Sequence, residues 1–505
     1  MSDESTVRPV GDTAPLAEAP IDLHRNALSL LGLVVLGIAY MGLALTAYFN
    51  FGIMEGITGP IVPLAFAAVT VLMLPTAASY AVMNARRPST GATLTWLWEA
   101  TTPGLGAWLG WVLVITYIVG CLLQPVMFGL FFNSFLNFFN VHTNTLTAVL
   151  AGIAAVVAVG ILTKRDIRVS ARTVGILITI EAGFVLLLSL YIMIKQGIDG
   201  NLSFQPFVPS AATAGWTGFL NALLFAVLAI AAFDIVAPMA EETRTPRSLV
   251  PKATILVTVG AGLYWVVTSF GIVNGVSANT MAGYVNSGQF TPIYLLADHY
   301  IGGLRILVPL TGFTAVFAAF SAISIAANRQ LYALSRERLA PRVFSHTDRN
   351  KNPWNAQLFV LGCCIVFPIL IVLYENNNPL AAFGWIGEAY VFFILIPYTL
   401  TCVANIFYHF RYHRNEINWV TNLILPLIGI AINVYIFYKN FFQTFVLHPT
   451  DFKTQTSITV VCFAVLVFAA IATYFGIRRL GGTRALAAPF RLDESPEANA
   501  AAEGT

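Results

Sequence analysis

Charged residues are scarce in this chain of 505 residues, which has 24 acidic and 27 basic side chains, or 10% of the total. Soluble domains carry about 25% charged residues, so the composition excludes a sizeable soluble domain. In their place, 57% of the residues are apolar and the mean hydropathy is +0.75. The apolar residues form runs of about 20, the length that crosses a bilayer core as a helix. The sequence therefore predicts an all-α integral membrane protein.

The signatures of soluble enzymes are missing as well. No Gly-Lys pair is present to form a P-loop, and neither His-Glu-x-x-His nor Gly-x-Ser-x-Gly occurs. His409 and His413 share one helix face, but no third ligand is close in the sequence, so we expect no metal site. The five cysteines lie in apolar runs and are expected to pack as small apolar side chains. We expect no enzymatic activity, no cofactor and no nucleic-acid partner.

About twelve apolar runs are predicted to cross the membrane as helices. Gly and Pro are scattered through these runs, which a bilayer tolerates in helices, and the alternating segments of a β-barrel are absent. Polar tails at 1–26 and 480–505 are expected to be disordered. The predicted spans are 27–50, 60–84, 107–135, 145–162, 173–194, 216–239, 253–276, 305–332, 356–374, 380–407, 420–438 and 456–476.

Positive charges divide unevenly between the two alternating sets of loops. One set is rich in Arg and Lys, whereas the other holds only Lys195, Arg305, Lys439 and Lys453. Cytoplasmic loops carry the excess of Lys and Arg, so we expect a cell-membrane protein with both termini in the cytoplasm. The basic set contains Arg86, Arg87, Lys164, Arg165, Arg168, Arg172, Arg244, Arg247, Lys252, Arg336, Arg338, Arg342, Arg349, Lys351, Arg411, Arg414, Arg478 and Arg479.

Three carboxylates lie inside predicted spans: Glu181 in the fifth, Asp234 in the sixth and Glu388 in the tenth. A charge at the bilayer centre costs at least about 2.5 kcal/mol on insertion scales, so such residues commonly mark the path of an ion or a substrate. No Lys or Arg lies deep in a span to pair with them, which favours a proton or a cationic ligand. The alternative for each acid is a protonated packing group, or a position near the membrane surface.

Three segments in the basic loops carry a recognisable pattern. The first is Glu242-Thr-Arg-Thr-Pro246-Arg-Ser-Leu-Val-Pro251-Lys-Ala253, after the sixth span. The second is Arg329-Gln-Leu-Tyr-Ala-Leu-Ser-Arg336, at the end of the eighth span, and the third is Arg87-Pro-Ser-Thr-Gly91 followed by Gly110-Trp111. They resemble the amino acid–polyamine–organocation (APC) transporter superfamily, with its Glu-Thr-x-x-Pro-x-x-x-x-Pro-x-Ala and Arg-x-Leu-Tyr-Ala-x-x-Arg segments. The resemblance covers most of residues 27–410.

The resemblance implies a LeuT-like fold of two inverted five-helix repeats in a core at 27–410, followed by two additional helices at 411–479. In such folds the first helix of each repeat, here span one or span six, is broken near the membrane midplane. Substrate and coupling ion bind at these breaks, between spans one, three, six and eight. The implied substrate site comprises Tyr40, Met41, Gly42, Leu43, Ala44, Tyr117, Ala231, Ala232, Phe233 and Asp234.

The two breaks depart from the family pattern. Many relatives have a tighter Gly-x-Gly in span one, which receives a substrate carboxylate, where this chain has Leu43, Ala44 and Leu45 after Gly42. Ala232 stands where many relatives have Gly. Both departures weaken the expectation of an α-carboxylate on the substrate. The aromatics Tyr40, Tyr117 and Phe233 are candidates for stacking on a cationic head group, the alternative being ordinary packing between helices.

A coupling-ion site is expected at Glu181, Ser321, Ser324 and Glu388. Glu181 aligns near a span-five position that holds a Lys in some proton-coupled relatives, and a carboxylate there suits a proton or a cation. Ser321 and Ser324 are placed to supply hydroxyl ligands to a sodium ion, although Ser in membrane helices more often bonds its own backbone.

The sequence thus predicts a secondary active transporter that moves an amino acid, an amine or a polyamine-like organocation by alternating access. Proton-coupled uptake is favoured, with sodium-coupled symport and substrate exchange as alternatives. A membrane-embedded enzyme is disfavoured, because the spans contain no nucleophile–base or metal constellation. The expected partners are a small-molecule substrate, a coupling ion and membrane lipid.

Overall fold

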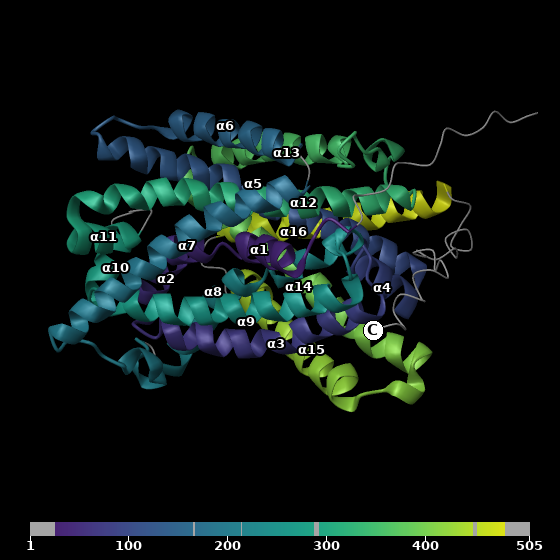
Figure 1. Ribbon diagram of the computed structural model, residues 1–505, viewed down its shortest axis with the longest axis horizontal. Coiled ribbons are helices and arrows are strands. Elements are labelled where there is room, and N and C mark those ends of the chain that lie inside the picture. Colours follow the sequence, from purple (N-terminus) through teal and green to yellow (C-terminus); the bar gives the residue numbers. More distant parts are fainter. Residues whose placement is uncertain (1–25, 165–166, 214, 287–291, 448–451, 480–505) are drawn as a thin grey trace, which may run out of the picture.

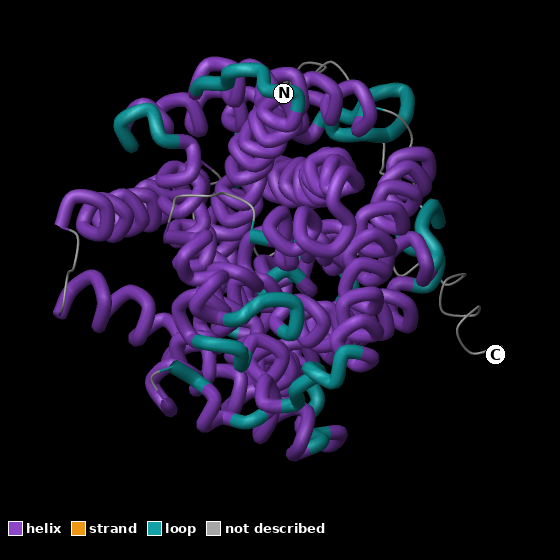
Figure 2. Tube along the Cα trace, turned by 90° about the vertical axis from the view of Figure 1, so that its left-hand side faces the viewer, coloured by secondary structure: helices purple, strands orange, loops and turns teal. Residues whose placement is uncertain are grey.

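The computed structural model describes residues 26–479, apart from 165–166, 214, 287–291 and 448–451. In this part of the chain every regular element is a helix, and the only pairing of extended residues is an isolated bridge between Leu28 and Thr243. Most helices run along the long axis of the molecule, and an end-on view shows them as one bundle (Figures 1 and 2). The tails expected at 1–26 and 480–505 lie outside the described residues, except for Asn26.

Eleven helical segments in the described part are long and apolar enough to cross a membrane. The predicted span at 216–239 is a twelfth, divided into α8 (Gly215–Ile230) and the 3-10 helix η3 (Phe233–Glu242), each too short to span alone. The predicted span at 27–50 is likewise divided, into α1 (Leu30–Met41) and α2 (Leu43–Thr58). The prediction of about twelve membrane helices with breaks in the first and sixth is therefore confirmed. Only the second half of span six differs, because it is wound as a 3-10 helix.

Most of the other long helices overlap the remaining predicted spans, whereas three short α-helices, at 93–100, 278–286 and 293–301, lie in segments predicted as loops. Between the breaks lie α3 (Val62–Arg86), α4 (Thr93–Ala100), α5 (Pro103–Phe138), α6 (Thr145–Thr163) and α7 (Ile167–Ile198). After the second break come α9 (Pro246–Val273), α10 (Ala278–Asn286), α11 (Ile293–Ile301), α12 (Leu307–Arg336), α13 (Trp354–Tyr374) and α14 (Pro379–Tyr412). The chain continues through the π-helix η7 (Val420–Ile424), α15 (Leu425–Phe437), the π-helix η8 (Tyr438–Leu447) and α16 (Phe452–Arg479).

Polar caps fix where several of these helices begin. The Thr102 hydroxyl accepts a hydrogen bond from the Leu105 N–H at the start of α5, and Pro103 follows at a position where its missing N–H costs nothing. Asn378 caps α14 in the same way, again directly before a proline. Asn144 and Thr147 form a reciprocal capping box on α6. Short polar segments between apolar runs therefore end one span and start the next.

Equivalent helices of the two repeats pack against each other. The second helix of one repeat, α3, lies against the second of the other, α9, and the third helices α5 and α12 are paired in the same way. The broken spans lie between these pairs, with α1 in contact with η3 and α2 with α8. This pairing is that of the inverted-repeat fold. It places the two backbone breaks beside each other inside the bundle.

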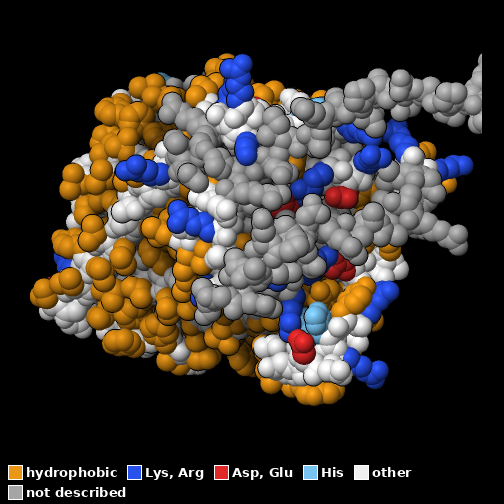
Figure 3. Space-filling model, turned by 45° about the vertical axis from the view of Figure 1, so that its right-hand side comes forward, with side chains coloured by type: hydrophobic (Ala, Val, Ile, Leu, Met, Phe, Trp, Pro, Cys, Tyr) orange, Lys and Arg blue, Asp and Glu red, His pale blue; other side chains and the backbone are white. Residues whose placement is uncertain are grey.

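The surface separates into an apolar belt and a basic end. Figure 3 shows Lys and Arg side chains gathered toward one end of the molecule, next to a surface that is largely hydrophobic. We call this the basic end, defined by Arg87 before α4, Arg244 before α9 and Arg336 at the end of α12. A belt of this kind matches a bilayer core about 30 Å thick.

Helices α5 and α6 approach each other closely, and this makes a stability prediction. A Cβ at Gly129 would lie 2.2 Å from the Ala148 carbonyl oxygen, a backbone atom that cannot rotate away. We expect Gly129→Ala to lower the free energy of unfolding by about 1–3 kcal/mol, despite the better helix propensity of Ala. The measurement is the melting temperature in detergent. Gly260→Ala in α9 is the control, because its Cβ would meet nothing within 4 Å. Equal melting temperatures for the two variants would contradict this close approach.

Candidate functional site

The first break falls at Gly42, between α1 and α2. Gly42 has φ 60° and ψ 61°, a left-handed conformation that glycine adopts without strain. Its N–H donates to the Ala39 carbonyl, and the Leu43 carbonyl beyond it accepts a hydrogen bond of 3.1 Å from Trp265 Nε1. The break therefore interrupts the helix ladder at a single residue, and a tryptophan from α9 bonds the first turn of α2 directly after it.

The second break falls at Ala231 and Ala232, between α8 and η3. Ala232 has φ −165° and ψ 3°, outside the helical region. The Ala231 carbonyl, freed from the helix ladder, accepts a hydrogen bond of 2.8 Å from the Tyr390 hydroxyl of α14. Alanine can occupy this break because its φ is extended and costs no left-handed strain.

A cavity of about 90 Å³ lies against both breaks. It extends from them along α2, away from the basic end, to Phe49 and Asn50. Five residues of the predicted substrate site line it: Tyr40, Met41, Gly42, Ala231 and Ala232. The other five, Leu43, Ala44, Tyr117, Phe233 and Asp234, do not line the cavity and are buried behind it.

Asp234 is held by two tyrosine hydroxyls. Tyr117 of α5 donates to Oδ2 at 2.6 Å, and Tyr398 of α14 donates to Oδ1 at 2.8 Å. The partners of this acid are therefore neutral hydroxyls, which a search of the sequence for Lys and Arg overlooks. Both donors stabilise a carboxylate, and the side chain is only 1% exposed. Tyr40 and Tyr390, at the cavity, are its further electrostatic neighbours.

Aromatic rings enclose this carboxylate. Phe233 stacks on Tyr398 with ring centroids 4.8 Å apart, and Tyr80 of α3 meets both rings edge-on at 5.7 Å. Tyr40 and Tyr390 form a further edge-on pair, with centroids 6.4 Å apart. We call Tyr40, Tyr80, Tyr117, Phe233, Tyr390 and Tyr398 the aromatic cage. Three of its members, Tyr80, Tyr390 and Tyr398, were not predicted from the sequence.

Gln124 adds a polar group that sequence reasoning also missed. It lines the cavity, and its Oε1 is buried without a hydrogen-bond donor in the described part of the chain. The side-chain amide nitrogen donates to the Gly120 carbonyl at 3.5 Å. A buried acceptor without a donor carries a free-energy cost, which a ligand that donates a hydrogen bond would remove. The only signal in the sequence is an amide deep within the apolar third span, whose other amide, Asn133, lies near the end of that span.

Glu181 lies in α7, apart from the cavity. The side chain is fully buried, and neither carboxylate oxygen accepts a hydrogen bond from any described residue. Its electrostatic neighbours are Tyr48 of α2 and Tyr264 of α9. Among the described residues, Glu181 thus has no hydrogen-bonding or ion-pair partner. An isolated carboxylate at such a place is costly to keep charged.

The other predicted coupling residues, Ser321, Ser324 and Glu388, do not line the cavity, and none of them forms a hydrogen bond with Glu181. The Ser321 hydroxyl donates to the Phe317 carbonyl at 2.7 Å, and Ser324 donates to the Ser321 carbonyl at 3.1 Å. Each serine thus bonds its own helix, as the alternative reading expected. Glu388 is exposed on the face of α14 that is turned toward Cys462 of α16. Its neighbour Gly387, by contrast, lines the cavity.

One further acid escaped the sequence analysis. Glu55, near the end of α2, is 1% exposed, and its carboxylate oxygens also lack a hydrogen-bond donor among the described residues. The signal was present, because Glu55 interrupts an apolar run between Phe51 and Thr58. It was overlooked because it lies beyond the predicted end of the first span.

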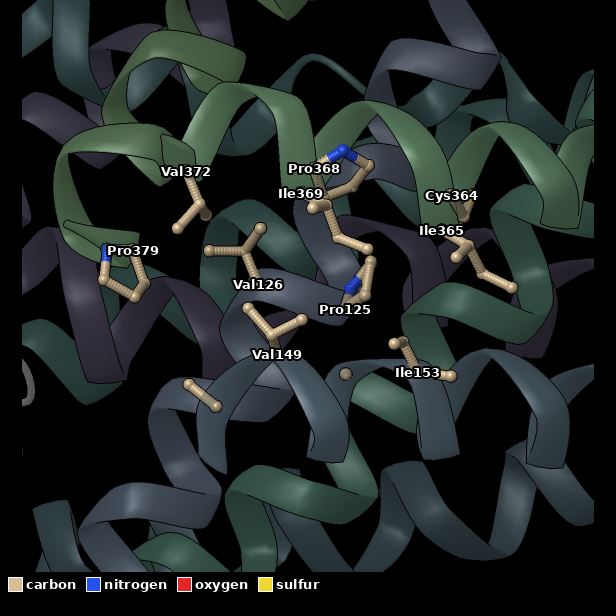
Figure 4. A pocket seen from close by; sticks show the side chains of 12 residues that line it. Pro125, Val126, Val149, Ile153, Cys364, Ile365, Pro368, Ile369, Val372 and Pro379 are labelled. Atoms are coloured by element: carbon tan, nitrogen blue, oxygen red, sulfur yellow. The ribbon is translucent and has the colours of Figure 1, made fainter. Parts of the chain in front are cut away.

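A second, smaller cavity is lined by apolar side chains and has no charged group for a ligand. It has a volume of about 30 Å³ and lies between α5, α6 and α13. Figure 4 shows its side chains, among them Val126, Val149, Ile153 and Ile365, pointing toward one another without a charged group. It is a packing gap between helices, so the cavity at the breaks remains the candidate site.

Comparison with known proteins agrees with this arrangement of two broken helices around a cavity. A family model described as "Amino acid permease" matches residues 26–478. The chain belongs to this family. Permeases are transporters rather than enzymes, so the predicted lack of enzymatic activity agrees with the family.

Three curated relatives span most of this permease. The low-affinity putrescine importer PlaP of Escherichia coli K12 is 21% identical over 330 residues, covering 63% of this chain and 69% of the relative. The branched-chain amino acid permease BcaP of Bacillus subtilis is 24% identical over 352 residues, covering 66% and 73%. The gamma-aminobutyric acid permease of Escherichia coli K12 is 23% identical over 401 residues, covering 75% and 82%.

A solved structure agrees with the fold. A manganese transporter from Eremococcus coleocola superposes with a TM-score of 0.55 at 14% sequence identity, covering 89% of this permease and 94% of that chain. At this level of identity the similarity concerns the fold alone.

The three sequence segments that carry the family resemblance meet at the basic end of the permease. Arg329 of α12 donates to Glu242 at the end of η3, with Nε to Oε2 at 2.7 Å and Nη2 to Oε1 at 3.1 Å. Arg336 forms a similar pair with Glu241, at 2.8 and 2.9 Å, and Glu241 also accepts from the Thr90 N–H. We call this set of contacts the basic-end network.

The network also holds the start of the first span. The Leu28 N–H donates to the Glu242 carbonyl at 2.9 Å, and the Arg244 N–H donates to the Leu28 carbonyl. Arg329 and Glu242 are each only 1% exposed. The permease is therefore closed at its basic end, while its cavity lies on the other side of the breaks.

Removing one partner of this buried pair should destabilise the permease strongly. We expect Glu242→Gln to cost about 3–5 kcal/mol of unfolding free energy, because Arg329 keeps an uncompensated buried charge. The double variant Glu242→Gln/Arg329→Gln should recover part of the loss. Arg86→Gln, which breaks an exposed pair with Glu416, should cost about 0–1 kcal/mol. Thermal melting in detergent measures all three, and a wild-type melting temperature for Glu242→Gln would contradict the expectation.

Proposed function

We propose that this permease is a secondary active transporter for a small organic molecule bearing a protonated amine: an amino acid, an amine or a polyamine-like cation. The observation that carries the proposal is Asp234, a buried carboxylate within the aromatic cage, directly behind the cavity at the two breaks. The names of the relatives support it, because putrescine, branched-chain amino acids and gamma-aminobutyric acid all carry an amino group.

The chemistry around the cavity suits an ammonium group. The residues that line the cavity include no Lys or Arg, while Gln124 offers an unpartnered acceptor and Tyr40 and Tyr390 present aromatic rings. A cation gains electrostatic attraction from ring faces and from a nearby carboxylate. A carboxylate on the substrate would instead bind the freed N–H groups after Gly42, where a half-helix begins.

Transport in this proposal proceeds by alternating access. The cavity is turned away from the basic end, and the basic-end network closes the other side. Passage of the substrate then requires the contacts among Leu28, Glu242 and Arg329 to open. By the excess of Lys and Arg we assign the basic end, with both chain termini, to the cytoplasm of a cell-membrane protein.

For the driving force we favour a proton on Glu181. A fully buried carboxylate without a donor is most stable when protonated, so the two orientations of the transporter can differ in its proton affinity. Sodium-coupled symport is the runner-up, in which Ser321 and Ser324 would have to exchange their backbone hydrogen bonds for an ion. Substrate exchange is the third possibility and needs no coupling ion.

The substrate proposal predicts the effect of altering Asp234. Asp234→Asn keeps the shape of the site but removes its charge, so uptake of an amine at subsaturating concentration should fall by at least about 30-fold. Tyr398→Phe deletes one hydrogen bond to the carboxylate and should cost about tenfold. The measurement is uptake of radiolabelled amines and amino acids into proteoliposomes. The melting temperature serves as the control for folding. If Asp234→Asn melts at the wild-type temperature and takes up substrate at the wild-type rate, the proposal is wrong.

The coupling proposal predicts a different response from Glu181→Gln. This variant should lose the substrate accumulation that an imposed pH gradient drives, because the glutamine side chain cannot bind and release a proton. It should keep counterflow exchange of labelled for unlabelled substrate, because the substrate still binds. Glu388→Gln is the matched comparison, since it removes an acid from a face of α14 turned away from the cavity. Uptake that is driven by a sodium gradient and is lost when Ser321 or Ser324 is replaced would instead establish sodium-coupled symport.

A further inference from the structure

A large apolar groove lies between α5, α13, α14 and α16, away from the candidate substrate site. Its volume is about 850 Å³, roughly nine times that of the cavity at the breaks. Along α13 its lining runs from Phe359 to Tyr374, a length of about 22 Å at the helical rise. The groove is therefore long enough to follow more than half of a bilayer core about 30 Å thick.

The groove is closed at its base by buried side chains and is open on one side toward the membrane. Leu122 and Ala389 at the floor are buried, whereas Phe367, Leu370 and Val461 along the sides are more than 40% exposed and belong to the apolar belt. A membrane lipid can therefore enter from the side, and its chain would be surrounded by protein on several faces. This differs from a lipid that only covers a convex helix surface.

One polar group in the groove lacks a partner. Trp111 lines it, packs edge-on against Phe468, and its Nε1–H is buried without an acceptor in the described part of the chain. Trp111 lies eight residues into α5, or about 12 Å from the end of the helix at Pro103. A buried indole N–H normally finds an acceptor, so this donor points to a missing oxygen at that depth.

Arginines from two elements frame the end of the groove nearest to Trp111. Pro341 and Phe344 line this end, and the exposed Arg342 lies between them in the chain, with Arg338 just before. The last turn of α16 meets the same loop, because a Cβ at Gly476 would lie 3.4 Å from the Leu339 carbonyl, and the exposed Arg478 and Arg479 follow directly.

The acids near this rim are engaged elsewhere. Glu241 is paired with Arg336, and Glu337 also faces Arg336, at 3.8 Å. Arg342 forms no ion pair with any described residue. The rim therefore presents an excess of positive charge beside an apolar groove, the combination that binds anionic lipid head groups between membrane helices.

We propose that this groove binds one anionic phospholipid. The phosphate lies among Arg338, Arg342 and the last residues of α16, an ester carbonyl accepts the Trp111 indole N–H, and one acyl chain fills the groove along α13. The site is independent of the proposed transport function. A zwitterionic lipid of the same chains would lack the net charge that the arginine rim selects.

The test measures lipid binding to the full chain after exhaustive detergent exchange. Native mass spectrometry and thermal shift are recorded with dioleoyl phosphatidylglycerol and with dioleoyl phosphatidylcholine. We expect one tightly retained phosphatidylglycerol per chain and at least about fivefold weaker binding of phosphatidylcholine. Equal retention of the two lipids would overturn the proposal and leave only a nonspecific lipid belt.

Paired variants separate the two polar anchors. Arg342→Gln should weaken phosphatidylglycerol binding about fivefold and leave phosphatidylcholine unchanged, whereas Arg247→Gln, an exposed arginine at the start of α9, should change neither. Trp111→Phe keeps the ring but deletes the donor, and should weaken both lipids about fivefold. Its control is Trp216→Phe on the exposed end of α8, which should have no effect.

Two outcomes would overturn the assignment of the anchors or of the occupant. Unchanged lipid binding in both Arg342→Gln and Trp111→Phe would show that neither group holds a lipid in the groove. A concentration-dependent dimer whose formation protects Cys363 in the groove from alkylation would show that a second copy of the chain covers this face instead.

Discussion

The buried ion pair between Arg329 and Glu242 is the interaction on which the rest of the permease depends. Two charges taken out of water are stable only if their hydrogen-bonding capacity is met. Here Asn328 and Asn352 accept two further guanidinium hydrogens, at 2.8 and 3.3 Å. The pair ties α12 to η3, and through the Glu242 carbonyl it also holds Leu28 ahead of the first span. A single contact thus fixes one end of both broken helices.

Fixing that end also stabilises the 3-10 helix that follows the second break. The 3-10 helix η3 has poorer hydrogen-bond geometry than an α-helix, and it would not persist for ten residues without anchors at both ends. Its outer anchor is Glu242, and its inner anchor is Asp234, bonded to Tyr117 and Tyr398. The side chains at the inner anchor, Asp234, Tyr117 and Tyr398, therefore also lie behind the cavity. One ten-residue element thus connects the basic end to the residues behind the cavity.

Sequence reasoning predicted the span count from hydropathy, which is a local property of the chain. The two broken spans were predicted from the resemblance to the APC superfamily, and the structure places their breaks at Gly42 and Ala232. Sequence reasoning could not predict which face of α14 carries Glu388, since all-round apolar helices lack a polar face to set their rotation. It also missed the tyrosine donors to Asp234, which come from helices more than a hundred residues away in either direction. Pairings of that kind are set by packing.

The aromatic cage has a consequence for selectivity. Tyrosine and phenylalanine have only two side-chain torsions, and here Tyr80, Phe233 and Tyr398 hold one another by ring contacts while Tyr117 is tied to Asp234. These side chains would therefore lose little rotamer entropy on ligand binding. Ordering them would reduce the binding free energy only slightly. A guest that reached past the cavity toward Asp234 would meet rings that cannot rearrange, whereas within the cavity the flexible side chains of Met41, Gln124 and Met127 could still adapt to its outline.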